Sequence, residues 1–296
     1  MNAIEKNNQR AEQLKKTRNN FRGFFDISIH DLSKKAPYYG YIETTVNNIP
    51  VYMFSNNDDF VAQNFFWNGD NAYEPLSLTI WSLISKVSPC ILDIGSYSGI
   101  YSLVSCKANH KAKIHAFEAL DRVFTRLIIN KNVNDFGNMT LYNVAVSSKK
   151  GKIELNTYSG DSILVSGSSI MNKNIENICA KKMVQAVSID DYKFENVGLV
   201  KIDAEGAEHL VIEGMINTIR AYQPTLLVEL LEGAEIAKIQ EMISGLGYNY
   251  FQIDELNMKF IRVKGLVVSD NMNNLNTLIT RYELSDLNTM VESADR

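Results

Sequence analysis

Acidic side chains stand at the ends of several strand-like apolar runs in this sequence. Asp93 lies in one such run, Glu118 closes a second, and Asp203 follows a third. Ionised carboxylates can accept hydrogen bonds from paired hydroxyls, neutralise an ammonium group or take up a proton. Because the carboxyl ends of parallel strands meet at one edge of an open α/β sheet, we expect these acids to share one crevice.

A glycine turn follows the first of these runs. The apolar, β-branched run 90–94 leads to Gly95 and Gly99 and then to apolar residues at helical spacing over 100–104. This pattern predicts a strand, a tight turn and a helix, which is half of a βαβ unit. Glycine lacks a Cβ, so a ligand can approach the backbone closely, and the first helical N–H groups would point at it. A helix start without a ligand has the same local pattern.

Two acids indicate what kind of ligand this turn would bind. Glu118 ends the apolar run 113–117, at the separation where nucleotide-binding βαβ units place a carboxylate on ribose hydroxyls. The three-glycine fingerprint of dinucleotide sites is absent, and Asp93 would repel a diphosphate but could pair with an ammonium group. The two acids together suit a ligand with a nucleoside at one end and an amino acid at the other. S-adenosyl-L-methionine has this form, and we predict it as the cofactor.

The composition is that of an ordinary globular protein. The 296 residues are 45% hydrophobic and 22% charged, with a formal net charge of -4, so we expect no general attraction to nucleic acid. No run of about 18 apolar residues predicts a membrane span, and the polar start lacks the apolar segment of a signal peptide. Three scattered cysteines predict packing residues in a reducing compartment, and we expect a cytoplasmic protein.

The pattern divides the chain into an N-terminal extension over 1–70 and an α/β domain over 71–296. The extension begins with a polar tail and continues with strand-like pieces around an Asn47-Asn48 turn, which predicts a β-hairpin. Within the domain, the segment 152–187 reads as two strands around a Ser-, Gly- and Asn-rich loop, either a lid or simply exposed. An aromatic cluster between the two parts predicts a packing layer or rings that close over a ligand. It consists of Phe65, Phe66, Trp67, Tyr73 and Trp81.

Several motifs, in order over about residues 70–255, together resemble the FkbM family of S-adenosylmethionine-dependent methyltransferases. The most specific is Lys-Ile-Asp-Ala-Glu-Gly-Ala-Glu at 201–208. The others are Tyr73-Glu74, the turn 93–102, Phe117-Glu118 with Asn130, the run 143–146, Ile189-Asp190-Asp191 and Val228-Glu229. Family members usually carry Asn in the glycine turn where this chain has Tyr97, so a contact to the cofactor's amino-acid end would be missing or remade by Ser96 or Ser98.

The resemblance implies a class I methyltransferase fold, which is α/β with a mostly parallel seven-stranded sheet and helices on both faces. It also implies transfer of a methyl group to a hydroxyl of a sugar, a glycan or a secondary metabolite. Glu74 would shape the methionine end of the cofactor. The predicted cofactor-binding residues are Glu74, Asp93, Gly95, Ser96, Tyr97, Gly99, Tyr101, Glu118 and Asp203.

Methyl transfer to a hydroxyl calls for a base, because an alcohol proton is very weakly acidic. Asp203 is our first candidate and Glu205 the next; His209 is a third, although a lone histidine on a helix is more often a surface residue. The alternative is that Asp203 caps the helix and that Glu205 and Glu208 sit in its first turn. A divalent metal bridging Asp203, Glu205 and Glu229 would be possible, but the chemistry does not require one and we predict none.

Two other functions use the same strand, turn and helix. One is an NAD-dependent or nucleotide-sugar enzyme, which Asp93 and the missing third glycine disfavour. The other is a catalytically silent binding domain, which would follow if the Tyr97 ring obstructs the cofactor.

Overall fold

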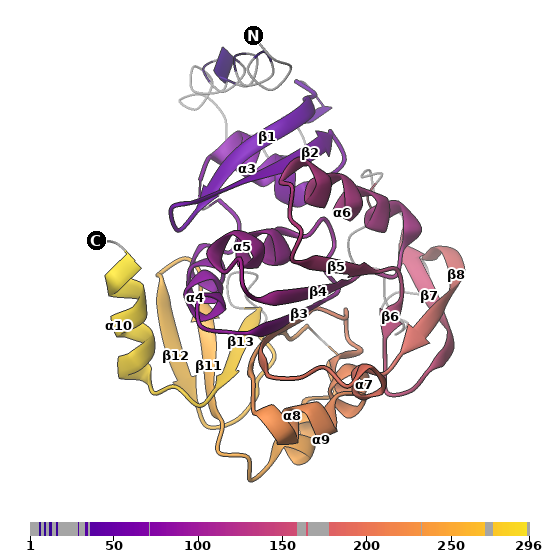
Figure 1. Ribbon diagram of the computed structural model, residues 1–296, viewed down its shortest axis with the longest axis vertical. Helices are drawn as coiled ribbons and strands as arrows, with labels where there is room; N and C mark the ends of the chain where they lie inside the picture. The colour runs from indigo at the N-terminus through magenta and orange to yellow at the C-terminus, as the bar shows by residue number, and fades with distance from the viewer. Residues whose placement is uncertain are drawn as a thin grey trace.

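In the computed structural model an eight-stranded sheet lies at the centre, with helices on both faces (Figure 1). The strand order is β12-β11-β13-β10-β9-β3-β4-β5. The strands are β3 (Cys90–Ile94), β4 (Lys113–Phe117), β5 (Met139–Tyr142), β9 (Val197–Ile202), β10 (Thr225–Glu229), β11 (Asn249–Asp254), β12 (Lys259–Val263) and β13 (Asn276–Thr280). The structure describes residues 36–70, 72–158, 164, 178–231, 233–269 and 275–294, with isolated positions before residue 36.

The predicted mostly parallel sheet is confirmed, with one strand more than the seven expected. Strands β5, β4, β3, β9 and β10 pair in parallel, whereas β13 pairs antiparallel with both β10 and β11. The eighth strand is β12, which folds back antiparallel on β11 at the sheet edge. From β3 the chain continues to β4 on one side, while β9 lies on the other. This junction is the switch point at which open α/β sheets bind ligands.

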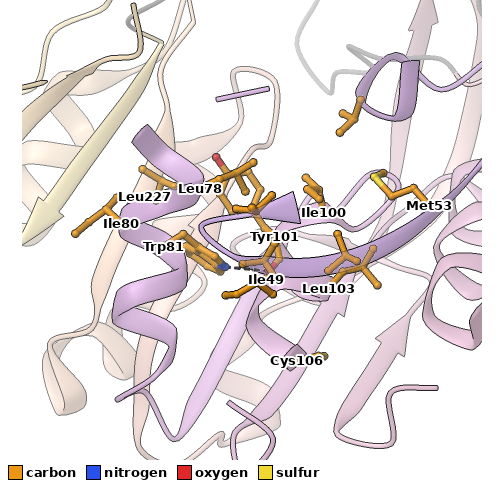
Figure 2. Packing of buried hydrophobic residues seen from close by; sticks show 14 of the residues in the cluster. Ile49, Met53, Leu78, Ile80, Trp81, Ile100, Tyr101, Leu103, Cys106 and Leu227 are labelled. Carbon is orange, nitrogen blue, oxygen red and sulfur yellow. Dashed lines mark hydrogen bonds between the residues drawn. The ribbon is translucent and has the colours of Figure 1, made fainter. Parts of the chain in front are cut away.

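The sheet separates two buried cores, and helices cover the core on each of its faces. On one face lie α4 (Pro75–Ser85), α5 (Ile100–Ala108) and α6 (Asp121–Val133), with α10 (Leu284–Ala294) beside α4. On the other lie α7 (Glu208–Glu213), α8 (Ile216–Tyr222) and α9 (Ile236–Ile243). Figure 2 shows the first core, where the indole N–H of Trp81 donates to the backbone oxygen of Tyr101 at 2.9 Å. This contact locks α4 to α5, the helix that follows the glycine turn.

The aromatic cluster before the central strand is mainly a packing layer. The side chains of Phe65, Phe66, Trp67 and Trp81 are at most 3% exposed, so the packing interpretation is confirmed for them. The buried thiols of Cys90 and Cys106 are also packing residues, as predicted. Tyr73 differs, because it is only partly buried and borders a cavity.

The N-terminal extension forms a hairpin and a helix that share the first core. Strands β1 (Tyr39–Val46) and β2 (Ile49–Asn56) pair antiparallel around Asn47 and Asn48, as predicted. Both asparagines have positive φ, 46° and 61°, which suits a tight hairpin turn. The helix α3 (Phe60–Asn68) was not predicted. It begins because the Asp59 carboxylate accepts a hydrogen bond from the N–H of Ala62 at 3.0 Å.

Helix α6 and the residue that follows it hold the open edge of β2 through three side chains spaced about one turn apart. Arg126 donates to a β2 carbonyl at 2.9 Å, Asn130 accepts from a β2 N–H at 2.7 Å, and Asn134 both donates and accepts. These bonds satisfy backbone groups that a two-stranded sheet leaves unpaired. The hairpin is therefore fixed against the domain.

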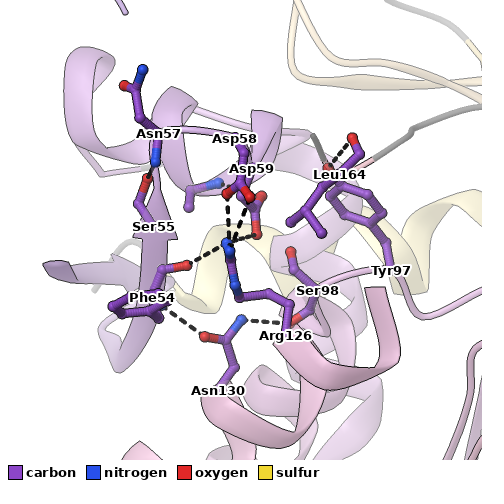
Figure 3. Close-up of polar contacts among 11 residues, drawn as sticks. Phe54, Ser55, Asn57, Asp58, Asp59, Tyr97, Ser98, Arg126, Asn130 and Leu164 are labelled. Atoms are coloured by element: carbon purple, nitrogen blue, oxygen red, sulfur yellow. Dashed lines mark hydrogen bonds and ion pairs between the residues drawn. The ribbon is translucent and has the colours of Figure 1, made fainter. Parts of the chain in front are cut away.

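Arg126 also holds the start of α3 (Figure 3). Its guanidinium pairs with Asp58 at 2.9 Å and lies 3.8 Å from the Asp59 carboxylate, and all three side chains are buried. Burial raises the pKa of Asp59 to about 6, while its bond from Ala62 and the charge of Arg126 act in the opposite direction. This cluster positions Phe60, the first residue of α3.

A second, three-stranded sheet consists of β6 (Ala145–Val146), β7 (Gly151–Tyr158) and β8 (Ile178–Val187). Strands β7 and β8 are the two predicted inserted strands, and β6 is added to them. A short 3-10 helix, η2 (Ile189–Tyr192), leads from β8 towards β9. The loop predicted as a lid or an exposed segment lies outside the described residues, apart from Leu164, and so does most of the polar tail. In the part of the chain that the structure describes, no helix has the length and apolar character needed to cross a membrane.

Candidate active site

The carboxyl ends of β3, β4, β9 and β10 surround a cavity of about 340 Å³. The start of α3 and Tyr73 border it from the side of the N-terminal extension. The predicted site residues in its lining are Asp93, Gly95, Ser96, Tyr97, Tyr101, Glu118, Asp203 and Glu205. The structure thus brings the acids of three different strands into one crevice, whereas Glu74, Gly99 and His209 lie outside the lining.

Gly95 marks the closest approach between the ends of β3 and β9. Its φ is 76°, and a Cβ at this position would lie 1.8 Å from the backbone oxygen of Asp203. Only glycine fits there. Gly99 has a φ of 96° at the start of α5, and a Cβ would meet the Leu127 side chain at 2.3 Å. Gly99 therefore shapes the turn without bordering the cavity.

Glu118 is held in place by the glycine turn. Its two oxygens accept hydrogen bonds from the backbone N–H groups of Tyr97, at 3.1 Å, and Leu120, at 2.8 Å. Burial raises its pKa to about 7, although these N–H bonds favour the ionised form. The two carboxylate oxygens have four lone pairs in all, so Glu118 keeps acceptor capacity beyond these bonds.

Tyr97 stands in the turn with a φ of 50°, which is uncommon for a residue other than glycine. Its ring forms part of the cavity wall, and its hydroxyl donates to the Leu164 carbonyl at 3.5 Å. Ser96 Oγ donates to the backbone oxygens of Asp93, at 2.8 Å, and Phe117. Ser96 therefore supports the turn, and the cavity persists beside the Tyr97 ring.

Asp93 is anchored at the first turn of α5. Its Oδ2 accepts from the hydroxyl of Ser102 at 2.6 Å and from the Ser102 N–H at 3.1 Å. Burial raises its pKa to about 6, opposed by the Ser102 hydroxyl and by the charge of Lys201. An ammonium group in the cavity would favour the ionised carboxylate.

Lys201 is a buried cation among the acids, and it is not one of the site residues predicted from the sequence. It is 2% exposed, and its Nζ lies 3.8 Å from Asp203 Oδ2 and 3.2 Å from Asn276 Oδ1. Burial lowers its pKa, but the surrounding carboxylates, Asp203 first among them, raise it to a greater extent, so the amine stays charged. A lysine inside an otherwise apolar strand was the available signal.

Glu229 shares a hydrogen bond with Asp203 in the same wall of the cavity. Burial and the neighbouring Asp203 charge raise the pKa of Glu229 well above its usual range. The raised pKa keeps Glu229 protonated to a higher pH than an ordinary carboxyl, so that it can donate the hydrogen bond to Asp203.

Glu74 lies behind the wall and accepts hydrogen bonds from the hydroxyls of Tyr73 and Tyr101. It is the residue before α4 and has a left-handed backbone, with a φ of 42°. Burial and the Glu74 charge raise the pKa of both tyrosines well above the usual value, so both hydroxyls remain donors. Glu74 thus orients two rings of the site.

The glycine turn and the acids at the strand ends all fall within the region that matches one family. The sequence model of the family described as "Methyltransferase FkbM domain" matches residues 93–250, more than half of the chain. The chain belongs to the FkbM methyltransferase family. The predicted resemblance to this family of methyltransferases is confirmed, and the α/β fold predicted with it is the one observed.

Relatives of this FkbM protein include 2-O-methyltransferase NoeI of Sinorhizobium fredii (strain NBRC 101917 / NGR234). The two are 29% identical over 154 residues, which is 47% of this chain and 63% of the relative. The chain therefore spans less than two thirds of that relative. A solved methyltransferase FkbM from Methylobacillus flagellatus KT superposes with a TM-score of 0.44 and 11% identity, over 65% of this chain and 43% of the other. A solved methyltransferase from Agrobacterium tumefaciens superposes with a TM-score of 0.44 and 8% identity, over 84% of this chain and 72% of the other.

In the motif at 201–208, the side chain of Asp203 does not cap a helix. Helix α7 begins at Glu208 with Ala207 before it, and no side chain caps it. Asp203 and Glu205 border the cavity instead, so the helix-cap alternative is wrong for these two acids. For Glu208 it holds, because this residue lies in the first turn of α7, where its Oε1 accepts from the Gly206 N–H at 2.8 Å.

His209 is not the surface residue that a lone histidine on a helix predicts. It is 8% exposed and lies on α7, the helix that packs against α9. Burial, followed by the charge of Lys238 on α9, lowers its pKa. It lies outside the cavity lining and is therefore not placed to take a proton from a ligand there. Among the described residues, no group of His, Cys, Asp or Glu side chains has the arrangement to hold a metal ion.

The buried acids of this FkbM protein predict a pH-dependent stability. Burial raises the pKa of Asp93 to about 6 and those of Glu118 and Glu255 to about 7, compared with about 4 in an unfolded chain. A carboxyl with a raised pKa contributes stability below its unfolded pKa and loses it as the pH rises through the folded pKa. Burial lowers the pKa of His115 to about 4, which opposes this trend below about pH 6.5.

Since the acids outnumber the buried histidines, we expect the free energy of unfolding to fall as the pH rises from about 5 to about 7. Urea denaturation across this range measures it. Glu118→Gln removes one of the titrating groups and should flatten the slope. A free energy of unfolding that increases over the same range would contradict the prediction.

Proposed function

We propose that the cavity binds S-adenosyl-L-methionine and that the protein transfers its methyl group to a hydroxyl of a sugar or glycan. The observation that carries this proposal is the meeting of Gly95, Glu118 and Asp203 at the sheet's switch point. The relative's name, 2-O-methyltransferase, supports an oxygen acceptor.

The residues of the cavity fit the two ends of this cofactor. Both oxygens of Glu118 have acceptor capacity for ribose hydroxyls, and the glycine turn lets a ligand contact the backbone. Asp93 is a buried acid that can face the ammonium group. Tyr101 is part of the wall, and Glu74 accepts the hydrogen bond of its hydroxyl from outside the lining, on the side where we place the amino-acid end.

The cofactor supplies an activated methyl group on its sulfonium. The chain must therefore orient the acceptor hydroxyl and take its proton. Asp203 is at the cavity surface and is the base in our proposal, with Glu205 as the second choice. Lys201 Nζ lies 3.8 Å from Asp203 Oδ2, and the Glu229 carboxyl is placed to donate a hydrogen bond to Asp203.

Calorimetric titration with S-adenosylhomocysteine tests the cofactor site without knowledge of the acceptor. We expect wild-type protein to bind it and Glu118→Ala to bind about 10- to 100-fold more weakly. The reason is that a hydrogen bond to a charged group contributes about 1.5–3 kcal/mol.

Asp121→Ala is the matched control, because Asp121 is an exposed acid three residues further on that pairs with Lys182 outside the cavity. It should leave the affinity unchanged. If Glu118→Ala bound S-adenosylhomocysteine as tightly as wild type, Glu118 would not be the ribose ligand.

A further inference from the structure

Phe60 is an aromatic residue of the cavity lining that has no role in the proposed cofactor site. It is the first residue of α3 and is 52% exposed, whereas Phe65, Phe66 and Trp67 of the same helix are buried. An exposed large apolar ring at the border of a cavity is a feature of binding sites.

The Phe60 ring has a defined neighbour and a fixed position. It lies 6.5 Å from the Tyr73 ring, edge to face, with an interplanar angle of 82°. Asp59, directly before it, caps α3, and the buried Arg126 fixes Asp58 and Asp59. The pair is therefore an ordered aromatic surface and pays little conformational entropy when a ligand binds.

The other side chains near this surface define the chemistry of its occupant. Asp203, Glu205 and Glu229 border the same cavity, and Lys201 is the one basic residue in the described lining. Carboxylates accept hydrogen bonds from hydroxyls and repel phosphate or carboxylate groups. An aromatic face beside several acceptors suits a ring with apolar C–H bonds on one side and hydroxyls at its rim.

We propose that Phe60 and Tyr73 form a platform for an uncharged carbohydrate ring of the acceptor and direct one of its hydroxyls toward Asp203. The inference rests on the proposed function and specifies its acceptor. Phe60 is then a specificity-determining residue, contributed by the N-terminal extension to the site of the α/β domain.

Saturation-transfer NMR on the protein with S-adenosylhomocysteine added tests this platform. The probes are the methyl glycosides of glucose, galactose and fucose, with glucose 6-phosphate and 1-naphthol for comparison. We expect saturation transfer to the ring protons of at least one neutral glycoside and none to glucose 6-phosphate. Phe60→Ala should reduce the signal about five- to tenfold, and Phe60→Trp should retain it.

Tyr39→Ala is the matched control, because Tyr39 is also an aromatic residue of the extension, is equally exposed at 52% and lies outside the cavity lining. Unchanged S-adenosylhomocysteine affinity in every variant shows that the fold is intact. Saturation transfer to 1-naphthol alone would contradict the platform, and so would equal saturation transfer to the glycosides in wild type and Phe60→Ala. Neither result would contradict the cofactor site. If wild type bound no S-adenosylhomocysteine, the proposed function would fail, and the glycoside signals of the free protein would still decide the platform.

Discussion

Asp203→Asn is expected to lower methyl transfer by about 10²- to 10⁴-fold, the range that a positioned general base contributes. Asparagine has nearly the same shape but cannot take up the hydroxyl proton. The affinity for S-adenosylhomocysteine should change little, because the backbone of Asp203, against which Gly95 lies, is kept. Transfer from radiolabelled cofactor to an accepted glycan, together with calorimetry, measures both quantities.

Glu205→Gln is the matched control for this change. Glu205 borders the same cavity, and the substitution removes the same charge. Most of the turnover should remain in this variant. If Glu205→Gln were the inactive variant, Glu205 would be the base. If Asp203→Asn lost turnover and cofactor affinity to the same extent, Asp203 would serve the cofactor or the fold.

Arg126→Ala is expected to destabilise the protein by about 3–5 kcal/mol, because it leaves the buried carboxylates of Asp58 and Asp59 without their cation. It also removes the hydrogen bond to β2 and the contact of the guanidinium with the Phe54 ring, 5.1 Å away. Urea denaturation measures the loss. Since this cluster places Phe60, the variant should also weaken acceptor binding more than cofactor binding.

Arg122→Ala provides the comparison, because Arg122 is exposed on the same helix one turn earlier. It should change the free energy of unfolding by less than about 0.5 kcal/mol. The double variant Asp58→Ala, Arg126→Ala should be less destabilised than the sum of the single variants, since it leaves one buried acid fewer unpaired. Strict additivity would show that the ion pair is not the cause.

The central sheet and its ligand turn were predictable because their signals are local. A five-residue apolar run followed by Gly95 and Gly99 defines strand, turn and helix within a few residues. The position of Glu118 at a strand end then follows from the topology of parallel sheets. The helix α3 was missed, because its start depends on Asp59, a single capping residue before a run of aromatic residues that also suits a strand.

The sequence by itself determined the family, the sheet with its glycine turn and the acids at the strand ends, since these depend on residue type and short spacing. Tertiary structure alone decided which side chains meet. It buried Lys201 among the carboxylates, buried His209 on α7 and exposed Phe60 beside Tyr73. Lys201 of β9, Phe60 of α3 and Tyr73 border one cavity only in the folded chain, and burial then sets the pKa values of the titratable groups there.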